Sequence, residues 1–281
     1  MSESVVFLGG GNMARALVSA WVEKGYPTSH ITVIDRNISK REYYQKSLGV
    51  RVAEAWSFED ALSDVIVLAV KPQDAKIPCQ IIGQDIQKLK GAKPLMLSLM
   101  TGIRMDLLEA WMGVSVPVVR CMPNMPAQIR EGATGLYAHP EVSHAQKSWV
   151  EAQMQALGIF AWLQQEEDIN SIIALSGSAP AFYFYFAEIM QEVGESMGLP
   201  KALVESFARQ TLYGAGALAK ASEKSFQTLR SEVTSKKGTT DAAIKSMQAQ
   251  GLSEILERAM IACRDRAREI AQNFAAETTQ G

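Results

Sequence analysis

The chain has 281 residues, of which 47% are hydrophobic and 21% charged, a composition typical of a soluble protein large enough for two domains. Its formal net charge is -2, so neither nucleic acid nor a membrane surface is an expected partner, because both favour a basic patch on the protein. Cys79, Cys121 and Cys263 lie far apart and offer no metal-ligand spacing. No signal-peptide pattern opens the sequence, so we expect a cytoplasmic protein that binds no metal.

The first half of the sequence alternates short apolar segments with helical ones. The apolar segments are rich in Val, Ile and Leu, as in buried parallel strands, and cover residues 4–8, 31–34, 65–70, 95–99 and 116–121. Residues 14–24 and 39–48 suit crossover helices, and residues 134–138 and 158–163 would extend the sheet. This alternation predicts an α/β fold, with a Rossmann-type doubly wound sheet in a dinucleotide-binding domain over residues 1–165.

The strand pattern ends near Glu166, and the rest of the chain is expected to be helical. Helices are predicted over residues 169–175, 181–197, 201–222, 226–233, 240–250 and 252–276. The uncharged segment 169–187 approaches membrane-span length, but its Ser, Gly and Pro residues favour a buried helix that begins near Pro180. Residues 166–281 are therefore predicted to form an all-α substrate-binding and dimerisation domain, because segment 182–186 is apolar on every side and suits burial between subunits.

A glycine-rich turn stands between the first predicted strand and the first predicted helix. It consists of Gly9, Gly10, Gly11, Asn12, Met13 and Ala14. In a dinucleotide fingerprint, Gly9 permits the tight turn, Gly11 lets the backbone approach a pyrophosphate, and Ala14 lets helix and strand pack closely. The helix N-terminus adds free N–H groups for the phosphates. We expect a nicotinamide dinucleotide here, since a turn that only reverses the chain would not need this strand and helix around it.

The second predicted strand ends at Asp35, Arg36 and Asn37, which we expect to border the cofactor. An acid at this place binds the ribose 2′-OH of NAD, whereas an arginine pairs with the 2′-phosphate of NADP. The sequence has both, so the preference stays open. In the alternative interpretation Asp35 caps the next turn and Arg36 is solvated.

The third candidate cofactor segment is Ala69, Val70, Lys71 and Pro72, at the end of an apolar strand. Doubly wound sheets bind ligands at the carboxyl edge of their strands, so Lys71 is a candidate ligand of phosphate or ribose. From composition alone, a loop lysine in solvent is the default interpretation.

Together with three later segments, these motifs resemble the pyrroline-5-carboxylate reductase family over nearly the whole chain. The later segments are residues 120–127 (RCMPNMPA), 175–181 (LSGSAPA) and 233–240 (VTSKKGTT), in the family's order and spacing. The resemblance implies a Rossmann domain and a helical domain that forms a homodimer, with a higher oligomer of dimers left open. It also implies reduction of the cyclic imine 1-pyrroline-5-carboxylate to L-proline with NADPH or NADH, NADPH being slightly favoured.

Carried over position by position, the resemblance places Met122 and Asn124 near the nicotinamide ribose. It assigns substrate binding to Ser235, Gly238, Thr239 and Thr240, with the Thr240 hydroxyl placed to donate to the ring nitrogen. Lys236 and Lys237 stand where the family has Pro and Gly, and Lys reaches glycine conformations only at a cost. A reductase of another cyclic imine or a small keto acid, and a non-catalytic dinucleotide-binding relative, therefore remain alternatives.

The chemistry of residues 235–240 supports an anion site independently of the resemblance. These residues lead into a predicted helix, whose free N–H groups and nearby hydroxyls can bind a carboxylate. A cyclic imine is basic and can enter as an iminium, so the protein needs little acid–base machinery beyond positioning and water exclusion. In the alternative interpretation Thr240 is only a helix N-cap.

Overall fold

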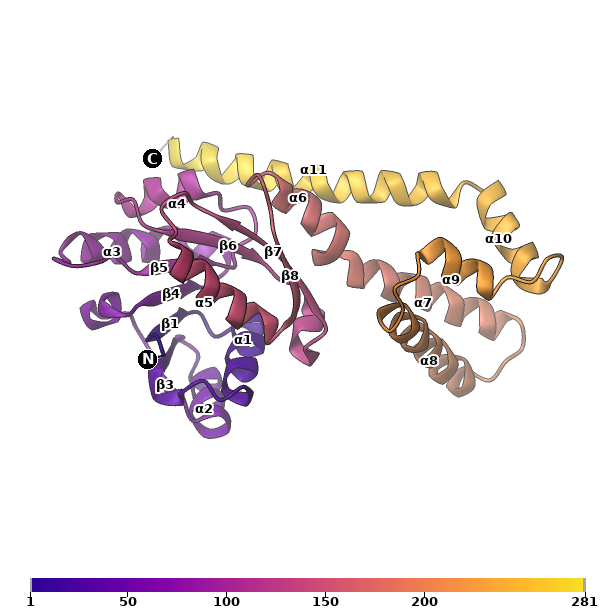
Figure 1. Ribbon diagram of the computed structural model, residues 1–281, viewed down its shortest axis with the longest axis horizontal. Coiled ribbons are helices and arrows are strands. Elements are labelled where there is room, and N and C mark those ends of the chain that lie inside the picture. Colours follow the sequence, from indigo (N-terminus) through magenta and orange to yellow (C-terminus); the bar gives the residue numbers. More distant parts are fainter. Residues whose placement is uncertain (1, 280–281) are drawn as a thin grey trace. The chain divides into compact units, whose positions relative to one another are not determined.

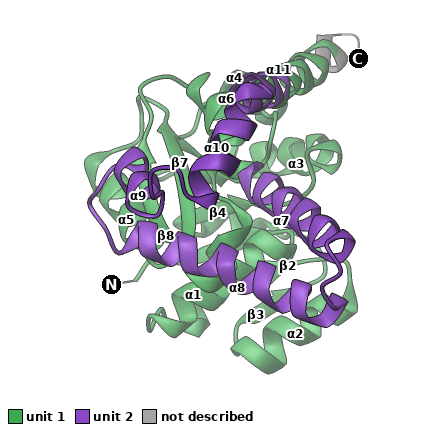
Figure 2. Cartoon of the chain, turned by 90° about the vertical axis from the view of Figure 1, so that its right-hand side faces the viewer, with its two compact units in different colours: residues 1–177, 263–281 green, residues 178–262 purple. Residues whose placement is uncertain are grey.

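The structure is a computed structural model that describes residues 2–279 (Figure 1). The chain divides into two compact units (Figure 2). The first unit comprises Met1–Gly177 with Cys263–Gly281, and the second is Ser178–Ala262. This division differs from the expected boundary after residue 165, because α6 (Asp168–Ile172) and the end of α11 (Leu252–Thr279) pack together in the first unit. Ile169, Ile173 and Ala267 form one buried cluster there.

The first unit contains a sheet with strand order β3-β2-β1-β4-β5-β6-β7-β8. The strands are β1 (Val5–Leu8), β2 (Ile31–Ile34), β3 (Arg51–Ala53), β4 (Val65–Leu68), β5 (Leu95–Ser98), β6 (Val118–Met122), β7 (Gly132–Ala138) and β8 (Gly158–Trp162). Each predicted strand is confirmed, whereas the short, partly exposed β3 was not predicted. Strands β1 to β6 pair in parallel, but β7 runs antiparallel to β6. The segment 123–131 between them holds only η4 (Met125–Ile129), which is too short for a crossover connection.

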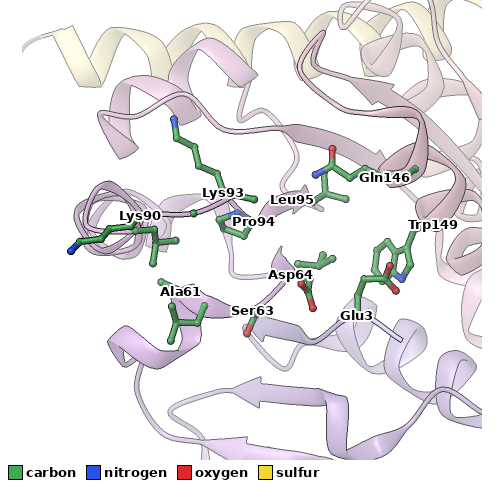
Figure 3. Close-up of a pocket in the computed structure, with 16 residues that line it drawn as sticks. Glu3, Ala61, Ser63, Asp64, Lys90, Lys93, Pro94, Leu95, Gln146 and Trp149 are labelled. Carbon is green, nitrogen blue, oxygen red and sulfur yellow. The ribbon is translucent and has the colours of Figure 1, made fainter. Parts of the chain in front are cut away.

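The two edges of this sheet differ in what they offer a ligand. A cavity of about 380 Å³ lies at the amino edge, where Glu3, Asp64 and Pro94 precede β1, β4 and β5 (Figure 3). Dinucleotides bind doubly wound sheets at the opposite, carboxyl edge, where the strand order reverses. The reversal here lies between β1 and β4, so the cavity is not the candidate cofactor site.

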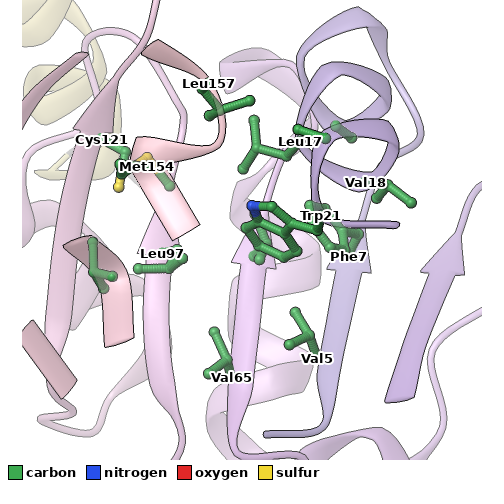
Figure 4. Packing of buried hydrophobic residues seen from close by; sticks show 14 of the residues in the cluster. Val5, Phe7, Leu17, Val18, Trp21, Val65, Leu97, Cys121, Met154 and Leu157 are labelled. Carbon is green, nitrogen blue, oxygen red and sulfur yellow. The ribbon is translucent and has the colours of Figure 1, made fainter. Parts of the chain in front are cut away.

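Helices cover both faces of the sheet. On one face lie α1 (Asn12–Glu23), α2 (Ile38–Leu48) and α5 (His144–Gln155), and on the other lie α3 (Lys76–Gln87) and α4 (Met105–Met112). Phe7 on β1 packs with Leu17 and Trp21 of α1 (Figure 4), whereas Val6 and Leu8 point into the core on the α3 and α4 side. Burial on both faces explains why the strands show no alternation of apolar and polar residues.

Besides η4 and the α-helices, the connections in the first unit include short helical turns. They are η1 (Thr28–His30), η2 (Phe58–Leu62), η3 (Pro72–Asp74) and a π-helical turn, η5 (Ile173–Gly177). Such π-helical turns occur often at functional sites. The turn was not predicted, because residues 169–175 show only an ordinary helical pattern.

The second unit is helical, as expected. It contains α7 (Ala179–Ser196), α8 (Lys201–Lys220), α9 (Phe226–Glu232), α10 (Thr239–Ala249) and the beginning of α11. Pro180 lies in the first turn of α7, and Gly198 follows its end with a φ of +88°. The position of Pro180 confirms the predicted helix start, and Gly198 is the left-handed residue after the end of α7.

Within one chain, only the beginning of the apolar segment 169–187 is buried, at Ile169, Ile173 and Ala174, whereas residues 178–187 are not buried. Among the described residues of the second unit, only Val204 and Ala208 are buried. By length and composition, Asp168–Ser196 could cross a membrane, but this alone is weak evidence. The second unit therefore presents apolar surface that needs a covering partner.

Candidate cofactor and substrate site

Most of the predicted cofactor residues gather at the carboxyl edge of the sheet. Because β1, β2, β4 and β6 belong to its parallel part, the residues that follow them share one edge. This edge carries Gly9, Gly10, Gly11, Asn12, Met13, Asp35, Arg36, Asn37, Ala69, Val70, Lys71, Pro72, Met122 and Asn124. The structure thus brings the candidate segments to the place where such sheets bind ligands.

Gly9 has to be glycine for reasons internal to the protein. Its φ is +99°, and a Cβ there would lie 2.8 Å from the carbonyl carbon and oxygen of Ala69. The Gly9 N–H donates to the Ile34 carbonyl at 2.8 Å. The turn is therefore held tightly between the ends of β2 and β4, as the glycine pattern predicts.

Gly11 has no such internal requirement. It is the N-cap of α1 with an ordinary φ of -75°, and a Cβ there would meet only the Ala69 oxygen, at 4.0 Å. No side chain among residues 2–279 caps α1, so its first N–H groups are free of side-chain partners. Open space in front of free N–H groups at a helix N-terminus fits a pyrophosphate.

The Asp35 carboxylate is turned toward the protein's own backbone. Its Oδ2 accepts from the Gly10 N–H at 2.8 Å, and its Oδ1 accepts from the Asn37 N–H at 2.8 Å. Lys40 Nζ lies 3.0 Å from Oδ2. Although burial opposes ionisation, the N–H groups of Asn37 and Gly10, together with Lys40, hold the pKa of Asp35 below its usual value. Asp35 therefore braces the glycine turn, a role that its sequence position did not indicate.

The loop after β2 exposes positively charged side chains beside Asp35. Arg41 Nη1 donates to the carbonyl oxygens of Asp35 and Arg36, at 2.8 and 2.9 Å, and fixes the path of the loop. The side chains of Arg36 and Lys40 are exposed. Asn37 caps α2 by accepting from the Lys40 N–H. The alternative in which Asp35 caps the next turn and Arg36 is solvated fits this geometry, because Asp35 accepts from the Asn37 N–H two residues on and the Arg36 side chain is exposed.

Lys71 and Asn124 have contrasting environments at the same edge. Lys71 is exposed just before η3. Asn124 is 8% exposed, and its Nδ2 donates to the Ser176 carbonyl of η5 at 3.1 Å while its Oδ1 accepts from the Ala133 N–H at 2.9 Å. Asn124 therefore holds the end of β6 to η5 and β7, which positions Met122 at the edge.

Thr101 is a polar residue near this edge that sequence reasoning missed. It follows β5, and its Oγ1 lies 3.9 Å from the Met122 sulfur. The only available signal was its place directly after a predicted strand end. No motif surrounds it, so nothing in the local sequence distinguished it from an ordinary loop threonine.

The candidate substrate loop lies in the second unit, and the cofactor residues lie in the first. The Gly238 N–H donates to the Ser235 carbonyl at 2.9 Å and closes a turn. Gly238 is the N-cap of α10, with Thr239 as its first residue. The alternative in which Thr240 is only an N-cap is therefore wrong, and its half-buried hydroxyl stays available for another role.

Lys237 occupies the left-handed region, with a φ of +61°. This conformation costs a residue with a Cβ about 1–2 kcal/mol. The expected conflict between Lys and a glycine position is therefore confirmed. The Lys237 N–H donates to Asp241 Oδ2 at 3.1 Å, and Asp241 forms an ion pair with Lys245 at 2.8 Å.

Two family models match the chain, one on each half. Residues 166–270 match the model described as "Pyrroline-5-carboxylate reductase dimerisation", and residues 4–91 match "NADP oxidoreductase coenzyme F420-dependent". The second match covers the glycine turn, the loop after β2 and the end of β4. These are the segments that the structure brings to the carboxyl edge.

Unlike each of the two family models, individual similar proteins match nearly the whole chain. The pyrroline-5-carboxylate reductase of Pseudomonas aeruginosa is 39% identical over 96% of this chain and 97% of its own. That of Pasteurella multocida is 34% identical over 97% of this chain and 99% of its own. The solved structure of a pyrroline-5-carboxylate reductase from Coxiella burnetii has a TM-score of 0.89 at 37% identity, and the match covers 96% of this chain and 99% of that one. From its sequence and fold together, this chain belongs to the pyrroline-5-carboxylate reductase family.

Proposed function

We propose that this protein reduces the C=N bond of 1-pyrroline-5-carboxylate to give L-proline, with NAD(P)H as the hydride donor. The observation that best supports the proposal is the open space beside Gly11 at the start of α1, in a chain 39% identical to a curated pyrroline-5-carboxylate reductase. The nicotinamide supplies the hydride when it is bound. The protein's tasks are to hold the two reactants in line and to exclude water.

The first unit carries the proposed cofactor residues. The free N–H groups at the start of α1, with Gly10, Gly11, Asn12 and Met13, bind the pyrophosphate. Gly9 and Asp35 fix the conformation of the turn. Gly9 donates to the carbonyl at the end of β2, and Asp35 accepts from Gly10 within the turn. Residues 69–72 and Met122 border the ribose and nicotinamide. Asn124 supports these residues indirectly, because its side chain is hydrogen-bonded to Ser176 and Ala133.

The second unit carries the proposed substrate residues. The first N–H groups of α10 and the hydroxyls of Ser235 and Thr239 bind the substrate carboxylate, with Gly238 shaping the approach. The Thr240 hydroxyl bonds the ring nitrogen, because it can donate to the neutral imine or accept from the iminium N–H. Hydride addition to C5 moves the C=N electron pair onto nitrogen, so an iminium needs no further proton from the protein.

A cofactor-oxidation assay tests the proposed reaction. NADPH or NADH should be oxidised only when the cyclic imine is added, and the product should be L-proline. Thr240→Ala should lower kcat/KM at least about tenfold, because the ring nitrogen loses its oriented partner, whereas Thr240→Ser keeps the hydroxyl. Absence of imine-dependent oxidation with both cofactors would rule the proposal out, and a panel of other cyclic imines and small keto acids would then identify a different substrate.

We further propose that the protein prefers NADPH to NADH. Both Asp35 oxygens already accept backbone N–H groups, so Asp35 is poorly placed to serve as the 2′-OH acceptor that favours NAD. Arg36 and Lys40 are exposed beside it and suit a 2′-phosphate. The description of the model matching residues 4–91 also names an NADP oxidoreductase.

The two cofactors compared side by side test this preference. Arg36→Ala should raise the KM for NADPH about tenfold or more, because a charge-assisted contact is lost, and should leave the KM for NADH nearly unchanged. Lys46→Ala removes an exposed lysine farther along α2 and should change neither. An equal effect of Arg36→Ala on both cofactors would contradict a role at the 2′-phosphate.

We also propose that the protein forms a homodimer through its second unit. Exposed aromatic residues of α7, such as Phe184 and Tyr185, supply apolar surface in a segment matched by the dimerisation model. A higher oligomer built from such dimers stays open to measurement by light scattering.

We infer a cytoplasmic location, in keeping with the three free cysteines.

A further inference from the structure

The turn before α10 adopts a conformation that its own residues disfavour. Among residues 2–279, only Arg130 and Lys237 combine a side chain with a positive φ, and Lys237 sits at +61° inside the candidate substrate loop. The L-configuration makes this region unfavourable for lysine. A contact from outside the turn is therefore needed to keep Lys237 in place.

Asp241 provides that contact from the first turn of α10. Its Oδ2 accepts from the Lys237 N–H at 3.1 Å. A carboxylate at the third helical position commonly reaches back to an N–H before the helix, as in a capping box. Here it reaches one residue beyond the Gly238 N-cap, so it fixes the turn instead of the cap itself.

Lys245 forms an ion pair with the same carboxylate. It lies one helical turn further along α10, with its Nζ 2.8 Å from the same Oδ2. The hydrogen bond from Lys245 is the main cause that lowers the pKa of Asp241, and the Lys237 N–H adds to it against the opposing effect of burial. Lys245 is largely exposed, whereas Asp241 is the more buried partner.

We propose that Asp241 is a positioning residue for substrate binding, which holds Lys237 in its left-handed conformation and so keeps the Ser235–Gly238 turn ready for the imine carboxylate. This inference rests on the proposed function of the loop. Asp241 acts through Lys237 and does not itself touch the substrate. It thereby offsets the cost of lysine at a position where the family carries glycine.

Steady-state kinetics of four variants test the proposal. Asp241→Ala should raise the KM for the cyclic imine about threefold to tenfold, because one charge-assisted bond to the turn is lost, with the KM for NADPH unchanged. Asp241→Asn retains an acceptor oxygen and should stay close to wild type. Lys245→Ala removes the ion pair alone and should have little effect. Lys237→Gly combined with Asp241→Ala should restore the imine KM, since glycine adopts a positive φ without support.

Two readouts separate this role from a merely structural one. Hydrogen exchange of the peptide spanning residues 233–240 should quicken in Asp241→Ala, and thermal unfolding should change little. An active wild type with an unchanged imine KM in Asp241→Ala would overturn the positioning role alone. Failure of Lys237→Gly to rescue, or an equal defect in Lys245→Ala, would also overturn it. Failure of the wild type to reduce the imine would instead overturn the proposed function.

Discussion

Gly9 and Gly11 stand two residues apart in one turn, yet they are glycine for different physical reasons. A side chain at Gly9 collides with the Ala69 backbone, whereas a side chain at Gly11 enters open space before α1. The first glycine is therefore needed for folding, whereas the second has no internal requirement and is accounted for by the proposed cofactor. This contrast allows the two roles to be separated by substitution.

Alanine at each position should give opposite results. Gly9→Ala should destabilise the protein by about 1–3 kcal/mol, because it combines a strained φ with backbone overlap. Gly11→Ala should leave the thermal unfolding midpoint nearly unchanged but weaken NADPH binding, measured by calorimetry, at least about tenfold. Normal NADPH affinity in a folded Gly11→Ala variant would contradict a pyrophosphate at this turn.

Asp35 should make stability depend on acidity. In the folded protein the pKa of Asp35 lies below its usual value. Its contribution to the unfolding free energy is therefore fully present above the pKa of the unfolded state, and it is lost as the pH falls through the pKa of the folded state. The difference in unfolding free energy between wild type and Asp35→Asn should therefore shrink between about pH 5 and about pH 2. Urea titrations across this range measure it, and a difference independent of pH would show that the charge is not involved.

At the scale of elements, a buried ion pair ties three segments of the first unit together. Arg120 on β6 is 5% exposed, and its Nη1 donates to Glu166 Oε1 at 2.9 Å. The same oxygen accepts the Met105 N–H at the start of α4, at 2.8 Å. Glu166 thus links the end of the sheet to the start of α4 and to the segment that enters α6.

Loss of this carboxylate should be costly. Glu166→Ala leaves Arg120 buried without its charge partner and should lower the unfolding free energy by about 3–5 kcal/mol. Glu167→Ala is a matched control, because Glu167 pairs with Arg268 in a more exposed setting and should cost less than about 1 kcal/mol. Chemical denaturation measures both, and equal losses would mean that burial of the pair is unimportant.

At the scale of the whole molecule, the second unit needs a partner to be stable. Only Val204 and Ala208 are buried among its described residues, which is far too small a core for an independent unit. Its apolar surface includes Phe184, which is 63% exposed. We propose that dimerisation through this surface supplies the missing core, which would also account for an exposed apolar helix of near membrane-span length.

A charge placed on this surface should break the assembly. Phe184→Glu should weaken the dimer at least about tenfold, because an apolar contact is lost and an unpaired charge is buried. Light scattering across a dilution series measures this change. Glu195→Gln, an exposed position on the same helix, should leave the dimer intact. A monomeric wild type would contradict the dimer itself, and an unaffected Phe184→Glu dimer would place the interface elsewhere.

Much of the fold followed from local patterns alone. Apolar segments, helical patterns, Pro180 and the glycine turn predicted the strands, the helices and the carboxyl-edge cofactor segments, because propensity, periodicity and capping act within a few residues. The short β3 escaped detection, since three residues with an exposed Arg51 carry too little pattern. The antiparallel direction of β7 was not predicted either, because it depends on how the segment after β6 folds back.

The roles of individual side chains in the site depended on contacts between distant residues. The sequence by itself determined that Asp35 follows a strand, and its resemblance to the family led us to expect a role for Asn124 and a conformational cost at Lys237. Only the tertiary structure decided that Asp35 bonds Gly10, that Asn124 joins η5 to β7 and that Asp241 holds Lys237. The physical reason is that a side chain's hydrogen-bond partners are set by three-dimensional packing, whereas its secondary structure is set largely by its neighbours in the chain.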